Sequence, residues 1–464
     1  MIRSKEVVAK TDRTGKTLMT VASRAQRVAR KADPEVLAMQ AHKPKKNMVK
    51  TRKLLVIAHN HPQFFPGGAE ILAYDLFKAV RDNSHYDPVF MAGVSQQDRL
   101  CHEAAAFQTL TEAEDELLFW GGTFDCLYQS NMILPFMYND FKQFLLKFQP
   151  DVIHFHHTMR FGLEALVVAR QVLPDVRIVY TLHEFILICN RDGQMVRKHN
   201  NALCNSASPA KCNRCFPEIP PALFRMREEF IKAHLEHVDL FISPSHFLAN
   251  RFIDWGIEDD RIVMLENGRY IDPPAPFRSL EKSGKRNVFG YFGQINPYKG
   301  AMLTFKAVEY LVNNGFTDFR LEIFGNVELQ EDDFKEDFFA FLDKYKDYVT
   351  FHGKYQNTDI PKLIKHVDWV IVPSTWWENS PLVIQEAFMH KRPIICSDIG
   401  GMAEKVDNNI TGLHFQARNE VSLADKIKTA CSDSHMWQRF VDNIGPRLSI
   451  EDCAKAHIEI YDNL

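Results

Sequence analysis

Short apolar runs alternate with longer segments of helical periodicity from Lys53 onward. Runs of four or five apolar residues rich in β-branched side chains are typical of strands buried on both faces of a parallel sheet. Several of the segments between them space apolar residues three and four positions apart, as an amphipathic helix does. The pattern predicts strands at Leu54–Ala58, Pro88–Met91, Val152–Phe155, Arg177–Thr181 and Leu240–Ser243, with a helix over Ala69–Val80.

A proline-rich and charged stretch interrupts this pattern at residues 272–287, and the alternation then starts again. Two consecutive α/β units of similar size predict two Rossmann-like domains facing a cleft. The second unit is predicted to contain strands at Val288–Phe292, Leu321–Phe324, Val349–Phe351, Trp369–Val372 and Pro393–Cys396, and helices at Ala301–Val312, Asp333–Tyr345, Pro361–His366 and Leu382–His390.

The predicted organisation therefore has five parts, which suits a chain of 464 residues. A basic extension is followed by an N-terminal Rossmann-like domain, a linker, a C-terminal Rossmann-like domain and helices that we expect to cross back to the first domain. In the same order these parts are residues 1–50, 51–272, 273–287, 288–435 and 436–464.

The composition is that of an ordinary globular protein, with 45% hydrophobic, 25% charged and 12% aromatic residues. It excludes disorder along the whole chain, a collagen-like protein and a small disulfide-rich scaffold. The longest apolar stretches fall far short of the roughly 18 residues that a membrane span needs. An integral membrane protein is therefore not expected.

Charge is distributed unevenly along the chain. Residues 1–50 hold thirteen Lys and Arg against four Asp and Glu, a balance of +9, so the remaining chain has −12 of the total −3. Within this basic part, Thr17–Lys31 has the spacing of a short, weakly amphipathic helix. It is either a solvated extension or a contact with an anionic membrane surface. The acidic remainder argues against a nucleic-acid partner.

The first residues also bear on where the protein acts. They lack an apolar core of signal-peptide length, so we expect a cytoplasmic, reducing environment, with peripheral association at the inner face of the membrane. A transit peptide is the alternative, because the segment is rich in arginine and poor in acidic residues.

Two glycines, Gly67 and Gly68, follow the first predicted strand and open a helix. Glycines let the backbone approach a ligand closely, and a helix N-terminus offers free N–H groups to an anion. A tight turn without a ligand would look the same. The spacing is not that of the dinucleotide-binding fingerprint.

The segment Gly290 to Gly300 repeats this arrangement in the second domain. Here too a strand ends in glycine, and Lys299 stands just before the next helix. A lysine in that place can neutralise a phosphate or a diphosphate leaving group, although a surface lysine in a turn is the simpler alternative.

Two glutamates eight positions apart, Glu378 and Glu386, lie in a loop and in the helix that Pro381 starts. A carboxylate on a helix suits bidentate hydrogen bonding to a vicinal diol such as a ribose, whereas the loop glutamate is suited to face a sugar. Spacing alone does not separate this hypothesis from chance.

Together these motifs resemble those of glycosyltransferase family 4, which has the GT-B fold. The matching motifs run in order over most of the chain, from about Leu54 to about Phe415. They are Gly67-Gly68-Ala69-Glu70, Asp151-Val-Ile-His154-Phe-His156, Thr181-Leu-His183-Glu184, Ser243-Pro-Ser245, Glu266-Asn267-Gly268, Gly293-Gln294-x4-Lys299-Gly300, Glu378-x7-Glu386 and Asp398-Ile-Gly-Gly401-Met-Ala-Glu404.

The resemblance implies a retaining transfer from a nucleotide-sugar donor bound mainly by the second domain, with no metal required at the diphosphate. It implies that Lys299 and the amides of Gly67 and Gly68 hold the diphosphate, that Glu386 binds the ribose, and that Glu378 lies by the sugar. His156 would face the reacting centre. The donor pocket would further include Gln294, Asn379, Ser380, Pro381 and Leu382.

Two positions depart from the family pattern. Gln294 stands where an arginine is usual, which removes one positive charge from the phosphate site. The usual Glu-Gly-Phe-Pro is Glu378-Asn379-Ser380-Pro381 here, which changes the rim of the sugar pocket. Both departures leave the fold prediction intact and make the donor less certain.

Several histidines fall at the ends of predicted strands, where the ligand-facing edge of a doubly wound sheet lies. His156 is the strongest functional candidate, and His154 and His183 are candidates for the acceptor side. Structural hydrogen bonding is the alternative for each of them.

Four cysteines fall within 27 residues: Cys189, Cys204, Cys212 and Cys215. Cys212 and Cys215 have the spacing of a chelating pair, and four thiolates around Zn²⁺ could hold a polar loop. An iron–sulfur cluster has the same number of ligands, and four unrelated thiols are the third alternative. We predict a structural zinc in the loop 189–215 and no cofactor for catalysis.

The predicted function is a retaining glycosyltransferase that moves a sugar from a nucleotide-sugar donor to a glycan or lipid-linked glycan acceptor, in surface polysaccharide biosynthesis. Its catalytic candidates are His156, Glu378 and Lys299. The alternatives are a nucleotide-sugar epimerase on the same fold and a non-catalytic interaction protein. Nucleotide release that depends on an acceptor would distinguish the first from the second, and failure to bind any nucleoside diphosphate would favour the third.

Overall fold

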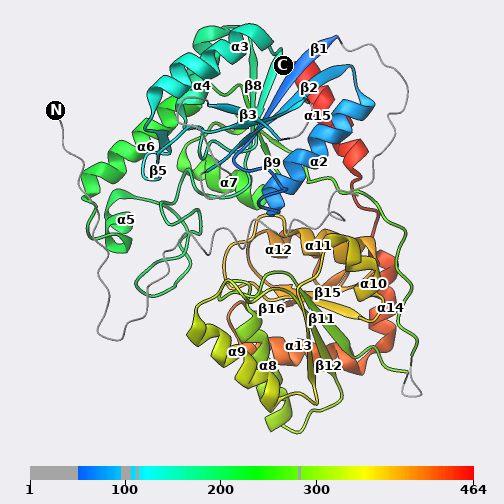
Figure 1. The fold of residues 1–464 in the computed structure, drawn as a ribbon. Coiled ribbons are helices and arrows are strands. Elements are labelled where there is room, and N and C mark those ends of the chain that lie inside the picture. Colours follow the sequence, from blue (N-terminus) through cyan, green and yellow to red (C-terminus); the bar gives the residue numbers. More distant parts are fainter. Residues whose placement is uncertain (1–50, 96–105, 111–113, 281–283) are drawn as a thin grey trace, which may run out of the picture. The chain divides into compact units, whose positions relative to one another are not determined.

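The first sheet contains eight strands in the order β10-β9-β8-β7-β1-β2-β4-β3 (Figure 1). We describe a computed structural model, which covers residues 51–95, 106–110, 114–280 and 284–464. Neighbouring strands are parallel except β3 and β4 at the edge, which are antiparallel. The strands are β1 (Arg52–Ala58), β2 (Tyr86–Gly93), β3 (Phe107–Thr109), β4 (Glu116–Phe119), β7 (Val152–Phe155), β8 (Arg177–Thr181), β9 (Leu240–Ser243) and β10 (Ile262–Met264).

Alternate residues of β1 enter two different hydrophobic cores, because successive side chains of a strand point to opposite faces. Leu55 and Ile57 belong to the core covered by α3, α4, α6 and α7, whereas Leu54 and Val56 belong to the core covered by α2 and α15. The helices and the small hairpin of this part are α2 (Gly68–Asn83), β5 (Phe124–Asp125), β6 (Ser130–Asn131), the π-helix η2 (Phe136–Phe141), α3 (Lys142–Phe148), α4 (Glu164–Val172), α5 (Pro209–Cys215), α6 (Pro221–Leu235), α7 (His246–Trp255) and η3 (Asp259–Arg261).

The second sheet has six parallel strands in the order β13-β12-β11-β14-β15-β16. Its strands are β11 (Val288–Phe292), β12 (Arg320–Phe324), β13 (Val349–Gly353), β14 (Trp369–Val372), β15 (Ile394–Ser397) and β16 (Gly412–Phe415). Its helices are α8 (Ala301–Asn313), α9 (Asp332–Lys344), η4 (Asn357–Asp359), α10 (Ile360–Ile364), α11 (Leu382–Met389), α12 (Gly400–Lys405), α13 (Glu420–Ser432) and α14 (Ser434–Asn443).

The predicted α/β class with two parallel sheets is confirmed, and the predicted elements lie where the apolar pattern put them. The five strands predicted for each sheet are present, with Pro393–Cys396 shifted by one residue to Ile394–Ser397. The four helices predicted in the second half are also present within one or two residues at each end. The pattern missed β16 and the short strands β3, β4 and β10. The predicted basic helix at Thr17–Lys31, with the rest of residues 1–50, lies outside the described residues.

The last helix, α15 (Ile450–Asn463), packs against α2 and completes the core on one face of the first sheet (Figure 1). Ile450, Ala454 and Tyr461 are its buried members in that core. The preceding helix α14 instead buries Trp437 and Phe440 in the second sheet's core. The chain thus leaves the second sheet after α14 and ends on the first.

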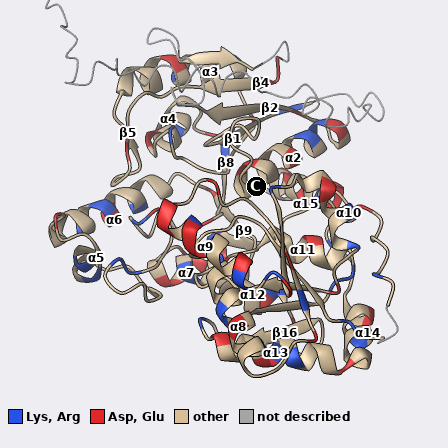
Figure 2. Ribbon diagram, turned by 60° about the horizontal axis from the view of Figure 1, so that its bottom comes forward, with Lys and Arg blue, Asp and Glu red and all other residues tan. Residues whose placement is uncertain are grey.

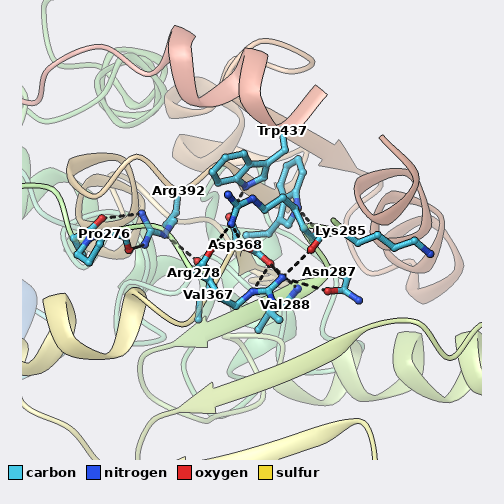
Figure 3. Close-up of polar contacts among 12 residues, drawn as sticks. Pro276, Arg278, Lys285, Asn287, Val288, Val367, Asp368, Arg392 and Trp437 are labelled. Atoms are coloured by element: carbon cyan, nitrogen blue, oxygen red, sulfur yellow. Dashed lines mark hydrogen bonds and ion pairs between the residues drawn. The ribbon is translucent and has the colours of Figure 1, made fainter. Parts of the chain in front are cut away.

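Residues 275–280 and 284–288 are tied to the second sheet by buried polar contacts (Figure 3). Arg278 and Arg286 both pair with Asp368, which is 1% exposed and precedes β14. Arg392 donates to the carbonyl oxygens of Ala275 and Pro276. This part of the predicted linker is therefore anchored on the second sheet.

Lys and Arg as well as Asp and Glu are scattered over the surface helices (Figure 2). Within the described ranges, no helix combines the length and apolar character needed to cross a bilayer.

Candidate functional site

In each sheet the strand order changes direction at one central strand, so that the chain runs outward from this strand to both sides. This strand marks the topological switch point of the sheet. In the first sheet β1 lies between β2 and β7, and in the second sheet β11 lies between β12 and β14. Ligands of open parallel sheets bind beyond the carboxyl ends of the strands at such switch points. The loops after β1, β7, β11 and β14 are therefore the candidate site, and they hold most of the predicted site residues.

The loop after β1 enters α2 through Gly67 and Gly68. Gly67 is the N-cap of α2, and no side chain caps the first turn. A Cβ at Gly67 would lie 2.3 Å from Oε2 of Glu70, so glycine is needed for this carboxylate to fold back on the loop. A Cβ at Gly68 would lie 3.6 Å from Cδ1 of Leu382, which brings this turn next to the start of α11.

Glu70 is a buried carboxylate that the sequence did not single out as a site residue. Its Oε1 accepts hydrogen bonds from His59 Nε2 at 2.9 Å and from Asn60 Nδ2 at 3.1 Å. Burial favours its protonated form, but these partners outweigh that effect and hold the pKa of Glu70 at about 2. Glu70 is therefore ionised and holds the loop that precedes the two glycines.

His154, on β7, is fully buried, and both of its ring nitrogens are engaged. Nδ1 lies 2.7 Å from the hydroxyl of Tyr461 on α15, and Nε2 lies 2.7 Å from Oγ1 of Thr181. The centroid of its ring lies 4.2 Å from that of His156, with the two ring planes tilted by 33°. His154 thus supports His156 from within the protein.

His156, directly after β7, lies with His183 at the carboxyl edge of the first sheet. Nδ1 of His156 is 3.0 Å from Nε2 of His183, and Nε2 of His156 is buried without a hydrogen-bond partner among the described residues. Burial lowers the pKa of His156 well below its usual value and that of His183 to about 3. Both rings are therefore neutral, and His156 has one nitrogen available to a ligand.

Lys299 is positioned by a tight turn between β11 and α8. Oδ1 of Asn296 accepts from the backbone N–H groups of Tyr298 and Lys299. Gly300 follows with φ of 81°, and a Cβ there would lie 2.0 Å from the carbonyl oxygen of Pro373, so only glycine fits. The turn places Lys299 beside the loop that follows β14.

Glu378, in that loop, accepts three hydrogen bonds on one oxygen. Its Oε1 lies 2.7 Å from Lys299 Nζ, 2.7 Å from Ser374 Oγ and 2.8 Å from Trp376 Nε1. Burial favours the protonated carboxyl, but Lys299 and the two other donors outweigh it and hold the pKa of Glu378 below its usual value. The structure therefore brings together two predicted catalytic residues, one of each charge.

The rest of this loop is tied to the first domain and to α12. Asn379 Nδ2 donates to the carbonyl oxygen of His183 at 2.7 Å, and its Oδ1 is buried without a partner among the described residues. Ser380 Oγ donates to Oε1 of Glu266 at 2.6 Å. Pro381 is the N-cap of α11 and Leu382 its first residue.

Glu386, one turn into α11, forms a buried ion pair with Arg269. Arg269 Nη2 lies 2.7 Å from Oε1 of Glu386, and both side chains are about one-tenth exposed. Burial raises the pKa of Glu386, and the guanidinium offsets only part of this effect. The backbone N–H of Arg269 donates to the carbonyl oxygen of Leu448, and its carbonyl oxygen accepts from the N–H of Ile450.

Of the predicted donor residues, Gln294 alone has an exposed side chain, and only its carbonyl oxygen is bonded, to the hydroxyl of Tyr291 at 2.9 Å. Sequence reasoning missed Arg269, Ser374 and Glu70. Arg269 directly follows the motif Glu266-Asn267-Gly268, which was the one available signal for it.

The four predicted metal-binding cysteines come together around one cavity of about 110 Å³. All four are free thiols, and burial raises the pKa of Cys189 to about 11. In the part of the chain that the structure describes, however, no group of three or more His, Cys, Asp or Glu side chains is arranged to hold a metal ion. The zinc site thus stays a prediction.

Comparison with known proteins identifies both halves of the chain. Residues 66–272 match the family described as Glycosyltransferase Family 4, and residues 274–445 match the family described as Glycosyl transferases group 1.

Two curated relatives illustrate the sequence similarity. An α-D-kanosaminyltransferase of Streptomyces kanamyceticus is 25% identical over 197 residues, which are 40% of this chain and 48% of that protein. UDP-Gal:α-D-GlcNAc-diphosphoundecaprenol α-1,3-galactosyltransferase of Escherichia coli is 32% identical over 188 residues, 38% of this chain and 47% of that protein. The chain thus spans about half the length of the curated relatives it matches.

Solved structures share the fold over nearly the whole chain. HepE of Anabaena, crystallised in complex with UDP and glucose, has a TM-score of 0.61 at 19% identity and covers 89% of this chain and 100% of its own. Sucrose-phosphate synthase of Thermosynechococcus elongatus has a TM-score of 0.64 at 16% identity and covers 89% and 99%. At these identities the likeness shows the GT-B fold.

Proposed function

Since this chain belongs to the GT-B glycosyltransferases of family 4 and group 1, we propose that it transfers a sugar from a nucleotide-sugar donor to a glycan or lipid-linked glycan acceptor. We propose further that the transfer retains the anomeric configuration. The observation on which this proposal rests is the contact between Lys299 and Glu378 at the switch point of the second sheet, with Glu386 on the helix α11 that follows the same loop.

The donor lies, in this proposal, along the loops after β11 and β14. Lys299 binds the diphosphate, Glu386 the ribose, and Glu378 the sugar hydroxyls. Because Lys299, Ser374 and Trp376 all use Oε1 of Glu378, its Oε2 keeps acceptor capacity for a hydroxyl donor. A carboxylate whose pKa is held low remains an acceptor through the physiological pH range.

The first sheet supplies the opposite side of the donor and the acceptor. The start of α2, which no side chain caps, binds the diphosphate through the Gly67–Gly68 turn, as helix N-termini bind anions; the Gly67 N–H must then leave the carbonyl oxygen of Phe65, to which it donates at 2.9 Å. The free Nε2 of neutral His156 faces the reacting centre, and His183 holds its ring through Nδ1. His154 acts as a positioning residue, since both of its nitrogens are already bonded.

The reaction then needs no enzyme nucleophile. The bond between C1 of the sugar and the diphosphate oxygen breaks, and the acceptor oxygen forms a new bond to C1 on the same face. The acceptor proton passes to the departing phosphate oxygen. Lys299 and the loop amides stabilise the negative charge that develops on the diphosphate, which is the main electrostatic contribution of the protein. We propose that these groups replace a divalent metal at the donor.

We propose the base and the sugar of the donor from one structural relative and one sequence relative. HepE binds UDP and glucose, and the Escherichia coli relative is named for UDP-galactose and a diphosphoundecaprenol acceptor. We therefore propose a UDP-hexose donor and a lipid-linked glycan acceptor in surface polysaccharide synthesis. The site of action in this proposal is the cytoplasm, at the inner face of the membrane, to which residues 1–50 would bind.

Nucleotide binding is the first test. We expect UDP, and more strongly a UDP-hexose, to raise the thermal stability of the full-length protein, by about 2.7 kcal/mol at a hundred times the dissociation constant. ADP and GDP serve as comparison ligands. Release of UDP that requires an added acceptor supports transfer, whereas release or sugar isomerisation without acceptor would support the epimerase. No binding of any nucleoside diphosphate would refute the proposal.

Three variants test the assigned roles. Lys299→Ala should lower turnover more than tenfold, which corresponds to about 1.4 kcal/mol or more of transition-state stabilisation. Glu386→Ala should mainly weaken nucleotide binding, and Glu378→Gln should mainly lower turnover. Lys306→Ala, an exposed lysine on the same helix that follows Lys299, is the matched control. Wild-type turnover and donor affinity in all three variants would show that the site is elsewhere.

A further inference from the structure

The cysteine cavity is built from three parts of one loop. Cys189 follows β8 by eight residues, Cys204 adjoins a bridge between Val196 and Leu203, and the remaining two lie one turn apart on α5. All four thiols line the same cavity. All four are only partly buried, and although Cys189 and Cys204 pack against the core of the first sheet, packing alone does not explain why residues up to 26 positions apart share one cavity.

The charge around this cavity is positive. Among the described residues that line it, the charged side chains are all basic: Arg191, Arg197, Lys211 and Arg214. Four neutral thiols carry no negative charge that these four cations would balance. Four thiolates around a divalent ion have a net charge of −2, and they would be stabilised by this surrounding.

Arg227, on α6, is a second and independent indication. It is 3% exposed, and its guanidinium donates only to the backbone carbonyls of Ile186, Leu187 and Ile188. Its Nε is buried without a partner, and it forms no ion pair with the described residues. It lines a small cavity together with Cys212 and interacts electrostatically with the thiols of Cys189 and Cys212.

A buried and unpaired cation is costly unless a negative group lies nearby. The two acidic residues that interact electrostatically with Arg227 are otherwise engaged, since Glu228 pairs with Lys232 and Glu184 with His157. The thiols are thus the groups that can supply the missing negative charge.

We propose that Cys189, Cys204, Cys212 and Cys215 bind one structural Zn²⁺ in this cavity. Binding replaces four S–H bonds by four S–Zn bonds and releases four protons to solvent, with no change of oxidation state. Among the described residues no such ligand group is formed, so the thiols must converge within the cavity that they line when zinc binds. With four protein ligands the ion has no open position and takes no part in sugar transfer.

The cysteine loop, residues 189–215, also contacts the proposed donor site at Tyr298 and in the loop of residues 373–380. Zinc binding would therefore order parts of the donor site as well as the cysteine loop. Arg191 Nη2 donates to the hydroxyl of Tyr298 at 2.7 Å, and Tyr298 stacks on Trp376, which donates to Glu378. Trp377 Nε1 donates to the carbonyl oxygen of Cys204 at 3.0 Å. Loss of zinc is therefore expected to loosen residues 373–380. The functional importance of this coupling rests on the proposed glycosyltransferase site.

Metal analysis of the full-length protein tests the proposal. Protein purified without chelators or a histidine tag should contain about one zinc per chain, and X-ray absorption should show four sulfur atoms about 2.3 Å from it. Protein free of metal, with all four thiols alkylated as fast as exposed Cys126, would overturn it. Iron, sulfide and visible absorption in place of zinc would likewise overturn the zinc assignment in favour of an iron–sulfur cluster.

Variants and chelation make the test specific. Cys212→Ser and Cys215→Ser should retain less than one-tenth of the wild-type zinc, whereas Cys126→Ser, which does not line the cavity, should retain all of it. Should the serine variants fail to fold, chelator treatment of the wild-type protein gives the same information: zinc loss should expose four additional thiols to alkylation, and loss of none would contradict the proposal.

The coupling is measured without any donor. Zinc removal should speed amide hydrogen exchange several-fold in residues 189–216 and also in residues 373–380, and re-addition of zinc should reverse both changes. Unchanged exchange in 373–380 would refute the coupling while leaving the zinc site intact. Failure of the protein to bind nucleotides would refute the proposed function without affecting either zinc result.

Discussion

The two glutamates of the candidate donor site have opposite pKa shifts, although both are buried. Glu378 has Lys299 and two neutral donors on one oxygen, and its pKa is lowered. Glu386 has a single partner, Arg269, and its pKa is raised. The number of donors thus decides which effect dominates, burial or stabilisation of the charge. The same residue type is thereby prepared for two roles within one helix and its preceding loop.

The pH dependence of activity should follow from the Lys299–Glu378 pair. In the wild-type protein the acid limb of kcat/KM should lie below the ordinary glutamate pKa, because the folded-state pKa of Glu378 is depressed. Lys299→Met removes the cation but leaves the burial, so the pKa of Glu378 should rise. The residual activity of this variant should therefore begin to fall at a higher pH as the solution is acidified.

The stability of the folded protein should depend on pH in the same direction as the activity. A depressed carboxyl pKa stabilises the folded wild-type protein above the unfolded pKa, and that contribution disappears as the pH falls through the folded pKa. In Lys299→Met the contribution should be absent or reversed. Lys306→Met is the matched control, with an unchanged profile. An acid limb at the same pH in Lys299→Met and the wild-type protein would contradict the coupling.

The sequence correctly placed residues that follow the end of a strand. His156, Lys299 and Glu378 follow β7, β11 and β14, and apolar periodicity located those strands to within one residue. It could not find Arg269, because the contact of this residue joins segments that only the tertiary fold brings together, nor Ser374, which lies four residues before its partner Glu378 but has no sequence pattern of its own. Arg269, for example, is 117 positions from its partner Glu386.

At the scale of elements, Asp368 connects the segment before β11 to the strand β14 (Figure 3). It accepts hydrogen bonds from Arg278 at 2.7 and 3.0 Å, from Arg286 at 3.1 Å and from the backbone N–H of Val288 at 3.1 Å. Asp368→Ala would leave two partly buried guanidinium groups without their counterion. We expect the free energy of unfolding to fall by about 3–5 kcal/mol, measured by urea denaturation.

An exposed pair in the same region provides the comparison. Lys285 pairs with Asp318, and each side chain is nearly half exposed. Asp318→Ala should change stability by no more than about 1 kcal/mol, because solvent screens such pairs. Equal effects of the two substitutions would show that Asp368 does not anchor this segment.

The elements that the sequence pattern missed are short or atypical. β3 and β10 have three residues each, which is too little for periodicity to register, and β16, although as long as β14, has His414 within its apolar run. The π-helix η2 has six residues and the cysteine-bearing α5 seven. In contrast, the fully buried strands were recognised because both faces are apolar, as in β14, where Trp369 and Ile371 enter one core and Val370 and Val372 the other.

The last helix, α15, is joined to the first sheet by a buried hydrogen bond, and one substitution can remove this bond while keeping the packing. Tyr461 on α15 is fully buried, and its hydroxyl lies 2.7 Å from Nδ1 of His154. Tyr461→Phe keeps the packing and leaves a buried nitrogen without a partner, so unfolding should become easier by about 1–3 kcal/mol. Tyr138→Phe, at an exposed position in η2, should have almost no effect. An unchanged stability of Tyr461→Phe would mean that the bond contributes nothing.

At the scale of the whole molecule, the sequence predicted two parallel sheets because the α/β pattern starts twice and each set of strands is apolar on both faces. It gave less information on how segments distant in sequence combine. The donor loop contacts both the cysteine loop and His183, and α15 returns to the first sheet. Such contacts depend on surface shape and on single side chains, for which a linear pattern has no signal.

The last prediction concerns the opposite charges of the two parts of the chain. Residues 1–50 have a balance of +9 and the remainder −12, so attraction to an anionic membrane would come from the extension alone. Each basic residue near an anionic surface contributes about 1 kcal/mol, and the effect is screened over about 8 Å at 0.15 M salt. Deletion of residues 1–50 should therefore leave the melting temperature nearly unchanged and lower co-sedimentation with anionic vesicles at least tenfold.

Full-length binding should weaken as salt rises and be absent with neutral vesicles. The variant with Arg24, Arg27 and Arg30 changed to glutamate should behave like the deletion, whereas vesicle binding that survives the deletion and is insensitive to salt would rule out a membrane role for this segment.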